Sequence, residues 1–180
     1  MNTQRYLLSA LLLMALLLTA SCAPSVCKEL SQGVDESILL PMVIKNPQGY
    51  EGRRVLWAGM IVSTMPREDG GTTIEILEKP RADNCRPENG DATGGRFLAV
   101  HERFLDPAVY SQGREITVVG AITGTEVRTI GEYKYTYPVV SMTNHILWPV
   151  KKRIYDYPRT YPYYPYYPFY DPFYRYPWRP

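Results

Sequence analysis

Regularly spaced prolines limit where this 180-residue chain can fold. In residues 155–180 proline recurs every three or four positions, at 158, 162, 165, 168 and 172. A proline has no amide donor and a fixed φ, so this segment cannot form a helix or an interior strand. An extended, polyproline-II-like segment is expected instead. A folded domain is therefore expected in the residues that precede this segment.

The N-terminus has the features of an export signal. Arg5 supplies a positive start, residues 7–18 form an apolar run, and small residues then lead into Cys22. The run has 12 residues, short of the ~20 that a bilayer-spanning helix needs. We predict a cleaved signal over residues 1–21. The alternative is an uncleaved anchor helix.

Small residues directly before a cysteine, here Thr19, Ala20 and Ser21 before Cys22, resemble the lipobox of bacterial lipoproteins. The sequence departs from the usual form at Thr19, where leucine is commonest. In those proteins the cysteine becomes the first residue and carries several acyl chains, palmitate among them, which anchor stably where one chain does not. The resemblance implies lipidation of Cys22. Ala23 after it implies sorting to the outer membrane, with the chain facing the periplasm.

The proline-rich tail, residues 151–180, also concentrates aromatic rings and positive charge. It holds 10 of the 16 tyrosines and has a net charge of +4. Such rings settle at membrane interfaces, and cations add attraction to anionic lipid. We predict that the tail contacts lipopolysaccharide or peptidoglycan; self-association would use the same side chains, and a disordered tail without a partner is the alternative. The predicted contact residues are Tyr163, Tyr164, Tyr166, Tyr167, Phe169 and Trp178.

Two cysteines, Cys27 and Cys85, remain after removal of the signal and apart from Cys22. In an exported chain such a pair favours one disulfide, which would tie the N-terminal segment to the body. Two free thiols are the alternative. The polar residues 22–36 are expected to form a tether between the acylated cysteine and the folded domain.

Residues 37–150 are expected to form one small β domain. A short helix over 37–46 should end before Pro47, and 104–113 should form a helical turn capped by Asp106. Gly120 is expected to mark a bulge. The expected strands are 54–63, 72–77, 96–101, 115–123 and 133–148. Five short strands with a helix between the third and fourth follow the order of an OB-like Greek-key barrel. A small sandwich of other topology is the main alternative.

Several motifs carry a resemblance to a known family. They are Asn46-Pro47-x-x-Tyr50-x-Gly52, Trp57-x-Gly59, Phe104-Leu105-Asp106-Pro107-x-x-Tyr110, Tyr135-x-Tyr137 and Trp148. Together with the lipobox they resemble the Slp-type, starvation-inducible outer-membrane lipoproteins. The resemblance implies a periplasm-facing lipoprotein, linked to starvation or acid stress, with no established biochemical activity. The tail is expected to lie outside it.

Patterns typical of catalytic and metal sites are missing. The chain has two histidines, His101 and His145, and neither an HExxH nor a Cys-x-x-Cys motif. His145 shares a strand face with Ser141 and Thr143, which predicts exposure to solvent. We therefore expect no catalytic residue, no metal and no cofactor. The whole-chain charge of +2 gives no case for nucleic acid.

Two functions remain open. The first is a non-enzymatic, structural or stress-protective role in the cell envelope. The second is a ligand-binding module that holds a glycan or small molecule on an aromatic barrel face, with Trp57, Tyr135 and Tyr137 as candidate contacts. Trp57 and Trp148 are otherwise expected in the core. A closed, filled barrel would favour the first function and an open apolar groove the second.

Overall fold

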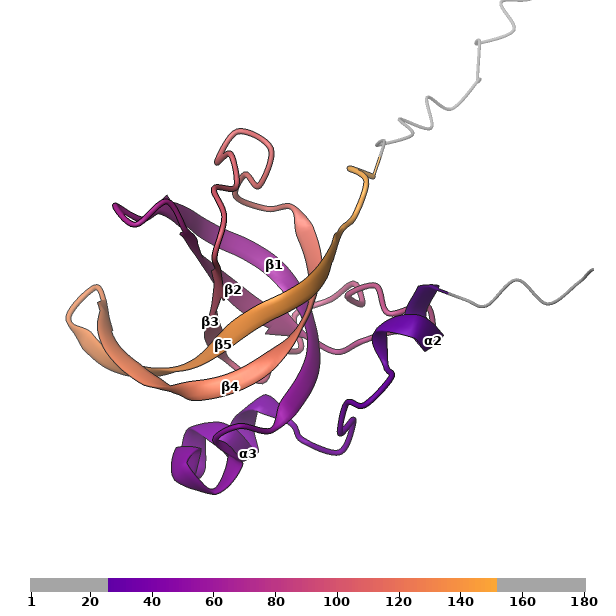
Figure 1. Ribbon diagram of the computed structural model, residues 1–180, viewed down its shortest axis with the longest axis horizontal. Coiled ribbons are helices and arrows are strands. Elements are labelled where there is room, and N and C mark those ends of the chain that lie inside the picture. Colours follow the sequence, from indigo (N-terminus) through magenta and orange to yellow (C-terminus); the bar gives the residue numbers. More distant parts are fainter. Residues whose placement is uncertain (1–25, 152–180) are drawn as a thin grey trace, which may run out of the picture. The chain divides into compact units, whose positions relative to one another are not determined.

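The computed structural model describes residues 26–151, which contain a five-stranded barrel (Figure 1). The strands are β1 (Arg54–Pro66), β2 (Thr72–Lys79), β3 (Arg96–His101), β4 (Glu115–Ile130) and β5 (Tyr133–Leu147). They close in the order β1-β2-β3-β5-β4. Every pairing is antiparallel except that of β3 with β5. The predicted OB-like barrel is therefore confirmed.

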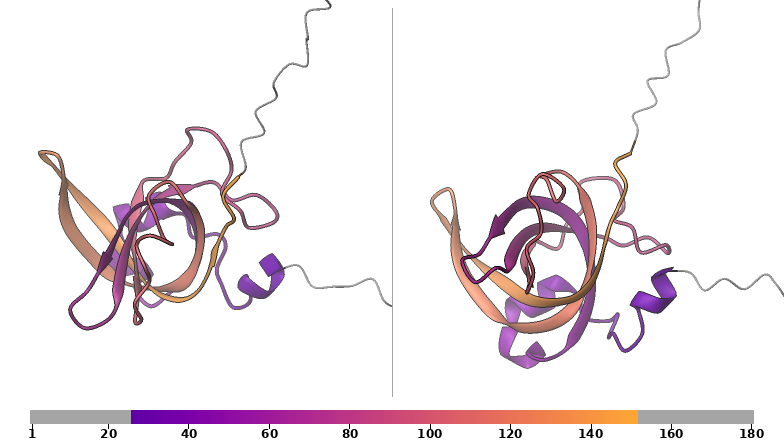
Figure 2. Two further views of the ribbon diagram at one scale, coloured as in Figure 1. Left: turned by 90° about the horizontal axis from the view of Figure 1, so that it is seen from above. Right: turned by 45° about the horizontal axis from the view of Figure 1, so that its top comes forward.

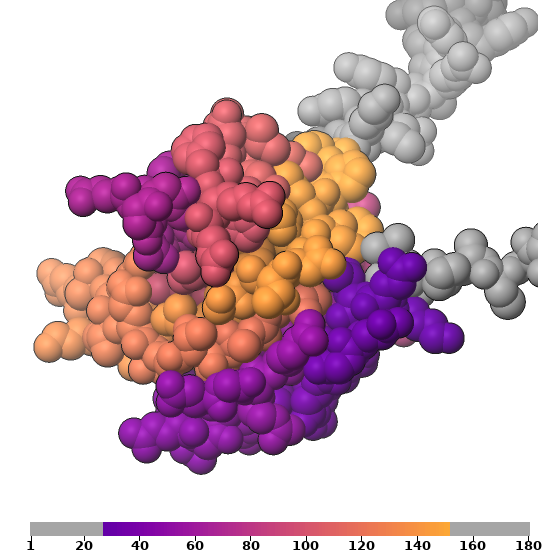
Figure 3. Space-filling model, in the orientation of Figure 1, coloured from indigo at the N-terminus to yellow at the C-terminus, as the bar shows by residue number. Residues whose placement is uncertain are grey.

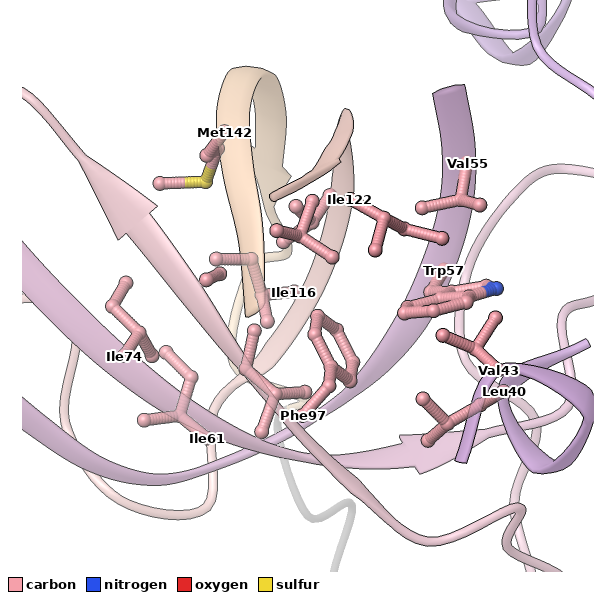
Figure 4. Close-up of a cluster of buried hydrophobic side chains, with 14 of the residues drawn as sticks. Leu40, Val43, Val55, Trp57, Ile61, Ile74, Phe97, Ile116, Ile122 and Met142 are labelled. Atoms are coloured by element: carbon pink, nitrogen blue, oxygen red, sulfur yellow. The ribbon is translucent and has the colours of Figure 1, made fainter. Parts of the chain in front are cut away.

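Alternating apolar residues fill the barrel interior. Val55, Trp57 and Ile61 of β1 are 1–5% exposed and point inward, as do Ile74 and Ile76 of β2 (Figure 4). β1 and β2 also approach each other very closely. A Cβ on Gly59 would lie 2.2 Å from the carbonyl oxygen of Leu77, so only glycine fits there.

Within the described residues ahead of β1, the chain forms three short helices: α2 (Val26–Leu30), α3 (Leu40–Lys45) and the 3₁₀ helix η1 (Pro47–Tyr50). None is long and apolar enough to cross a membrane. α3 starts later than predicted because Pro41 fits its first turn, and it ends before Pro47 as predicted. Leu40 and Val43 of α3 belong to the barrel core (Figure 4), so α3 covers one end of the barrel.

The predicted helical segment 104–113 is a single turn. Asp106 caps it as predicted, since its Oδ1 accepts from the Ala108 amide at 2.8 Å. Both flanks are fixed to strand residues: the Leu105 amide donates to Thr72 Oγ1, and the Gly113 amide donates to the carbonyl of Ile61.

β4 and β5 continue past the barrel as a two-stranded hairpin arm, residues 124–138 (Figure 2). Its ladder runs from Thr125 paired with Pro138 to Ile130 paired with Tyr133. The expected fourth strand stopped at residue 123, so half of this arm is not predicted. Its polar, glycine-containing sequence lacks the apolar alternation of a core strand, and the strand forms because it pairs with β5.

Candidate functional site

Trp57, the first candidate ligand contact, lies inside the barrel. Its side chain is 5% exposed, and its indole N–H donates to the Ile38 carbonyl at 3.0 Å. The ring packs edge-on against Phe97, with centroids 5.2 Å apart (Figure 4). A ligand on the barrel surface cannot reach it. The predicted ligand role of Trp57 is therefore wrong, and the core alternative is correct.

Tyr135 and Tyr137 join the hairpin arm to the outer wall of β2 and β3. The Tyr137 hydroxyl donates to Glu75 Oε1 at 2.9 Å, and the Tyr135 hydroxyl accepts from the Arg96 amide at 2.9 Å. Arg96 also pairs with Glu75 at 2.7 Å. We call these four residues the arm latch. Burial, and the hydrogen bond to Glu75, raise the pKa of Tyr137.

The arm latch leaves little for a ligand to bind. Tyr137 is 1% exposed, and the Tyr135 and Tyr137 rings pack edge to face, with centroids 4.8 Å apart. Both hydroxyls already have partners within the chain. The face on which OB-like folds bind ligands is thus occupied by the chain's own arm. These two tyrosines come together as predicted, but with Glu75 and Arg96 rather than with Trp57.

Two open clefts lie near the N-terminal segment, away from those aromatic residues. One, of about 690 Å³, is lined by residues 33–36 and 52–54. The other, of about 370 Å³, is lined by residues that include Arg81 and Glu36. Charged pairs dominate both: Arg53 contacts Asp35 at 2.5 Å, and Arg81 contacts Glu36 at 2.8 Å. Neither has the character of an apolar ligand groove.

A cluster of His101, His145 and Tyr110 lies where β3, β5 and the 104–113 turn meet. The two imidazole centroids are 5.7 Å apart, and the Tyr110 hydroxyl lies 2.8 Å from His145 Nε2. Burial, and then the proximity of His101, lower the pKa of His145. Burial raises the pKa of Tyr110. Across residues 26–151 no group of three or more His, Cys, Asp or Glu is placed to hold a metal ion.

The predicted exposure of His145 is wrong because of a bulge in β5. Val119 pairs with Asn144, but the next residue, Gly120, pairs with Met142. Thr143 is therefore an extra residue, and it reverses the faces of the strand beyond it. Leu147 then packs on the barrel core, while Ile146 and Trp148 pack outside the wall. The register shift lies at Gly120, where a bulge was expected, but its extra residue belongs to β5 and not to β4.

The outside of the barrel wall carries a second apolar cluster, which we call the outer cluster. Its members are Cys27, Leu30, Leu56, Cys85 and Val119, with Val34, Ile146 and Trp148 packed against them. Cys27 and Cys85 form the predicted disulfide, with Cα atoms 5.3 Å apart. Part of the segment 22–36, which was expected to be a tether, is folded instead. Helix α2 begins at Val26 and packs on the barrel wall through Cys27 and Leu30. The described residues begin at Val26, four positions after Cys22.

The loop that carries Cys85 also holds the end of β5. Arg86 donates to the Pro149 carbonyl at 3.0 Å and pairs with Glu115 at 2.5 Å. Its guanidinium lies 5.5 Å from the centroid of the Trp148 ring, and the Trp148 indole donates to Thr117 Oγ1. Both ends of the described chain therefore meet at the outer cluster. Figure 3 shows the indigo N-terminal segment beside the yellow end of β5.

The remaining predicted site residues lie outside the described residues. They are Cys22 and the tail residues Tyr163, Tyr164, Tyr166, Tyr167, Phe169 and Trp178. Sequence reasoning did not anticipate that Trp148, Arg86 and the Cys27–Cys85 disulfide would form one unit. The signal available was the cysteine pair alone, since nothing in the spacing places Cys85 next to the end of β5.

The described residues form a small OB-like barrel domain. Both ends of the described chain pack on its outer cluster. The sequence model of the family described as "Outer membrane lipoprotein Slp family" matches residues 19–178. The chain therefore belongs to this family of outer-membrane lipoproteins. The match also corrects our expectation about the tail, because it extends to residue 178 and so includes most of the tail.

Two curated relatives match part of the chain. The "Uncharacterized lipoprotein YeaY" of Escherichia coli (strain K12) is 32% identical over 115 residues, 64% of this chain and 58% of that protein. An "Uncharacterized protein" of Haemophilus influenzae is 34% identical over 107 residues, 59% of this chain and 57% of that protein. The chain thus spans less than two thirds of the length of either relative. Neither name describes an enzymatic activity.

A solved structure also matches, namely the small single-stranded DNA-binding protein from Streptomyces coelicolor. Its TM-score is 0.34 at 10% identity, covering 54% of this chain and 94% of that chain. At this score the likeness carries no conclusion about ligands. The assignment of an OB-like barrel stands on strand order and register alone.

Proposed function

We propose that this family member is anchored by acyl chains on Cys22, faces the periplasm, and has a non-enzymatic, structural or stress-protective role in the envelope. The observation that carries the proposal is the Cys27–Cys85 disulfide, which lies close to the lipobox in the sequence. Cys27 lies five residues after Cys22 and is bonded to Cys85 on the barrel wall. An acyl anchor at Cys22 would therefore hold the whole barrel through a very short connection.

The filled barrel supports a structural rather than a ligand-binding or enzymatic role. Trp57 is core, and Tyr135 and Tyr137 are engaged in the arm latch. The His101–His145–Tyr110 cluster contains no carboxylate or thiol that would complete a nucleophilic triad. These contacts support the first of the two functions left open by the sequence, and no contact favours the ligand-binding alternative.

Anchoring is tested by membrane fractionation of Cys22→Ser. We expect the wild-type chain in the outer-membrane fraction, labelled by radioactive palmitate, and the variant unlabelled and lost from that fraction. Cys27→Ser/Cys85→Ser is the matched control, because it removes two cysteines and leaves the lipobox intact. It should still be labelled. An outer-membrane location for Cys22→Ser would contradict the proposal.

The protective role is tested in cells that lack the gene. We expect the outer membrane to become more permeable to an apolar dye during starvation or acid exposure, and the wild-type gene to restore the barrier. Cys22→Ser should not restore it, whereas Trp57→Phe, which keeps an aromatic ring in the core, should. Unchanged permeability in the deletion strain under both stresses would count against the role.

The tail is proposed as an adhesive element that binds lipopolysaccharide or peptidoglycan. The support is its composition, 13 aromatic rings in residues 154–180 with a net positive charge. Deleting residues 154–180 from Cys22→Ser should weaken its co-sedimentation with outer-membrane vesicles or with isolated peptidoglycan. Equal pelleting of the two proteins would argue against this idea.

A further inference from the structure

The two ends of the described chain leave the barrel from one side. Cys27, on the N-terminal side, is 7% exposed and belongs to the outer cluster. Trp148, on the C-terminal side, packs in the same cluster, and Arg86 fixes the carbonyl of Pro149. Figure 1 shows α2 on one side of the barrel and the tip of the hairpin arm on the opposite side, and both views of Figure 2 agree.

We propose that the outer-cluster side is the membrane-facing surface of the barrel, and that the tail contacts the same lipid bilayer that holds the acyl chains. The membrane-facing surface comprises α2, residues 80–90 and residues 148–151. Its partner is an anionic phospholipid surface. This inference rests on the proposed anchoring by Cys22 and adds an orientation and a lipid partner to it.

Chain length restricts the position of this surface. The five peptide units from Cys22 to Cys27 span at most ~17 Å when fully extended. The disulfide to Cys85 fixes Cys27 on the barrel wall, so the barrel cannot retreat further than this from the lipid interface. An orientation with the Cys27 side nearest to the bilayer and the hairpin arm pointing away keeps the chain within this limit.

The residues that follow β5 are apolar and positively charged, which favours a position close to the bilayer. Val150 is 73% exposed, and Lys151, Lys152 and Arg153 follow directly in the sequence. Cations close to an anionic bilayer are attracted within about a Debye length, ~8 Å at physiological salt. Tyrosine and tryptophan settle at the headgroup level. Since the tail starts at the membrane-facing surface, its binding to the bilayer is intramolecular and benefits from a high effective concentration.

The test is hydrogen exchange of the acylated full-length protein on vesicles of phosphatidylethanolamine and phosphatidylglycerol, compared with Cys22→Ser in solution. Amides in 26–31, 80–90 and 148–151 should exchange about tenfold more slowly on vesicles. Amides in 126–133, at the tip of the arm, should not change. Slowing at the arm tip, or no slowing at the membrane-facing surface, would overturn the proposed orientation.

A spacer variant serves as the control. A flexible insert of about twenty Gly and Ser residues between Ser25 and Val26 spans roughly 25 Å on average, enough to release the barrel from the bilayer. It should float with the vesicles yet lose the slowing in residues 80–90. Retained slowing with the insert would show that the tether does not set the orientation, and would also overturn the proposal.

Tryptic cleavage at Arg159 and Arg175 reports on the tail in the same samples. Cleavage should slow on vesicles and recover in the variant Lys151→Gln/Lys152→Gln/Arg153→Gln. A tail that is cleaved equally fast on vesicles and in solution, or that is protected only by isolated peptidoglycan, would overturn the lipid contact. If the acylated protein does not float with vesicles at all, the proposed anchoring itself fails. Flotation without protection refutes this further inference alone.

Discussion

The surroundings of His145 disfavour its protonated form and lower its pKa. Its imidazole is partly buried, hydrogen-bonded to the Tyr110 hydroxyl at 2.8 Å, and 5.7 Å from the His101 ring. Burial raises the pKa of Tyr110, and the nearby guanidinium of Arg114 offsets part of that rise. A proton added to His145 would meet a desolvated site with positive or neutral neighbours. This residue therefore makes the stability of the folded chain depend on pH.

The sign of that dependence follows from the lowered pKa of His145. The unfolded chain, whose histidine has a pKa near 6.5, takes up the proton first, so acid favours unfolding. The free energy of unfolding should be unaffected by this titration above about pH 6.5 and should fall as the pH drops below that value. Urea unfolding between about pH 7.5 and 5.5 should show the fall in the wild type and a flatter profile in His145→Gln. Equal slopes would refute this assignment.

Gly59 marks the closest approach of β1 and β2. An added methyl would collide with backbone, the Leu77 carbonyl at 2.2 Å, which cannot move without opening the sheet. Gly59→Ala should therefore destabilise the fold by about 3 kcal/mol. Gly49→Ala is the control, because its nearest atom belongs to the movable Asn46 side chain, and it should cost less than about 1 kcal/mol. Chemical denaturation measures both, and equal costs would contradict the steric argument.

Single residues also show which structural features could not be predicted from the sequence. The alternation in β5 placed His145 on the solvent face, and one extra residue, Thr143, was enough to reverse that face. A bulge of this kind depends on pairing with β4 and leaves no local signature in the sequence. Trp57 could be read as core or as ligand contact, and only the closure of the barrel around it decides for the core.

At the scale of elements, the hairpin arm is held to the barrel by the arm latch. Tyr137 is buried and donates to Glu75, which also binds Arg96. The arm extends beyond the core, so these polar contacts and the Tyr135–Tyr137 pair are its main attachments in the described chain. The latch residues come from three strands, β2, β3 and β5.

Loss of one hydroxyl should loosen this attachment measurably. Tyr137→Phe removes the bond to Glu75 and keeps the ring, so it should lower the free energy of unfolding by about 1 kcal/mol and speed amide exchange in residues 124–138. Tyr133→Phe, at a side chain that is 70% exposed, is the matched control and should change neither quantity. The same exchange rates in both variants would show that the arm is held by its backbone ladder alone.

The disulfide fixes α2, a five-residue helix that is too short to be stable alone. Cys27 and Cys85 are 58 residues apart, and a chain-entropy model gives a cross-link over such a loop about 4 kcal/mol. Cys27→Ser/Cys85→Ser should lower the free energy of unfolding by up to that amount. Amides in 26–30 should then exchange freely while those of β1 stay protected. Protection of α2 without the disulfide would contradict this view.

Strand starts could be predicted better than strand ends. The expected starts at residues 54, 72, 96 and 115 are those observed, because turn residues precede each one. The fifth strand was expected only within 133–148, and it begins at Tyr133. The ends of β1, β2 and β4 lie beyond the predicted ends, because each strand stays paired with its neighbour after its apolar pattern has stopped. The helical turn expected over 104–113 is a single turn capped by Asp106, and tertiary hydrogen bonds fix both of its flanks.

At the scale of the whole molecule, side chains fill the interior of the barrel, and both ends of the described chain pack at the outer cluster. The sequence predicted the disulfide, the barrel and the family, because each has a local signature. It did not predict that Trp148 and Cys27 would share one cluster, since that depends on how the 79–95 loop folds across the wall. This convergence brings both ends of the described chain to one side of the barrel.

The account depends most on Cys22 as the acylated first residue of the mature chain. Intact-mass spectrometry of the protein purified from outer membranes measures this directly. The predicted mass is that of residues 22–180 with the Cys27–Cys85 disulfide formed and with acyl chains added, and fragmentation should place those chains on Cys22. A mature protein that keeps residues 1–21, or that begins at Cys22 without any acyl chain, would contradict the account.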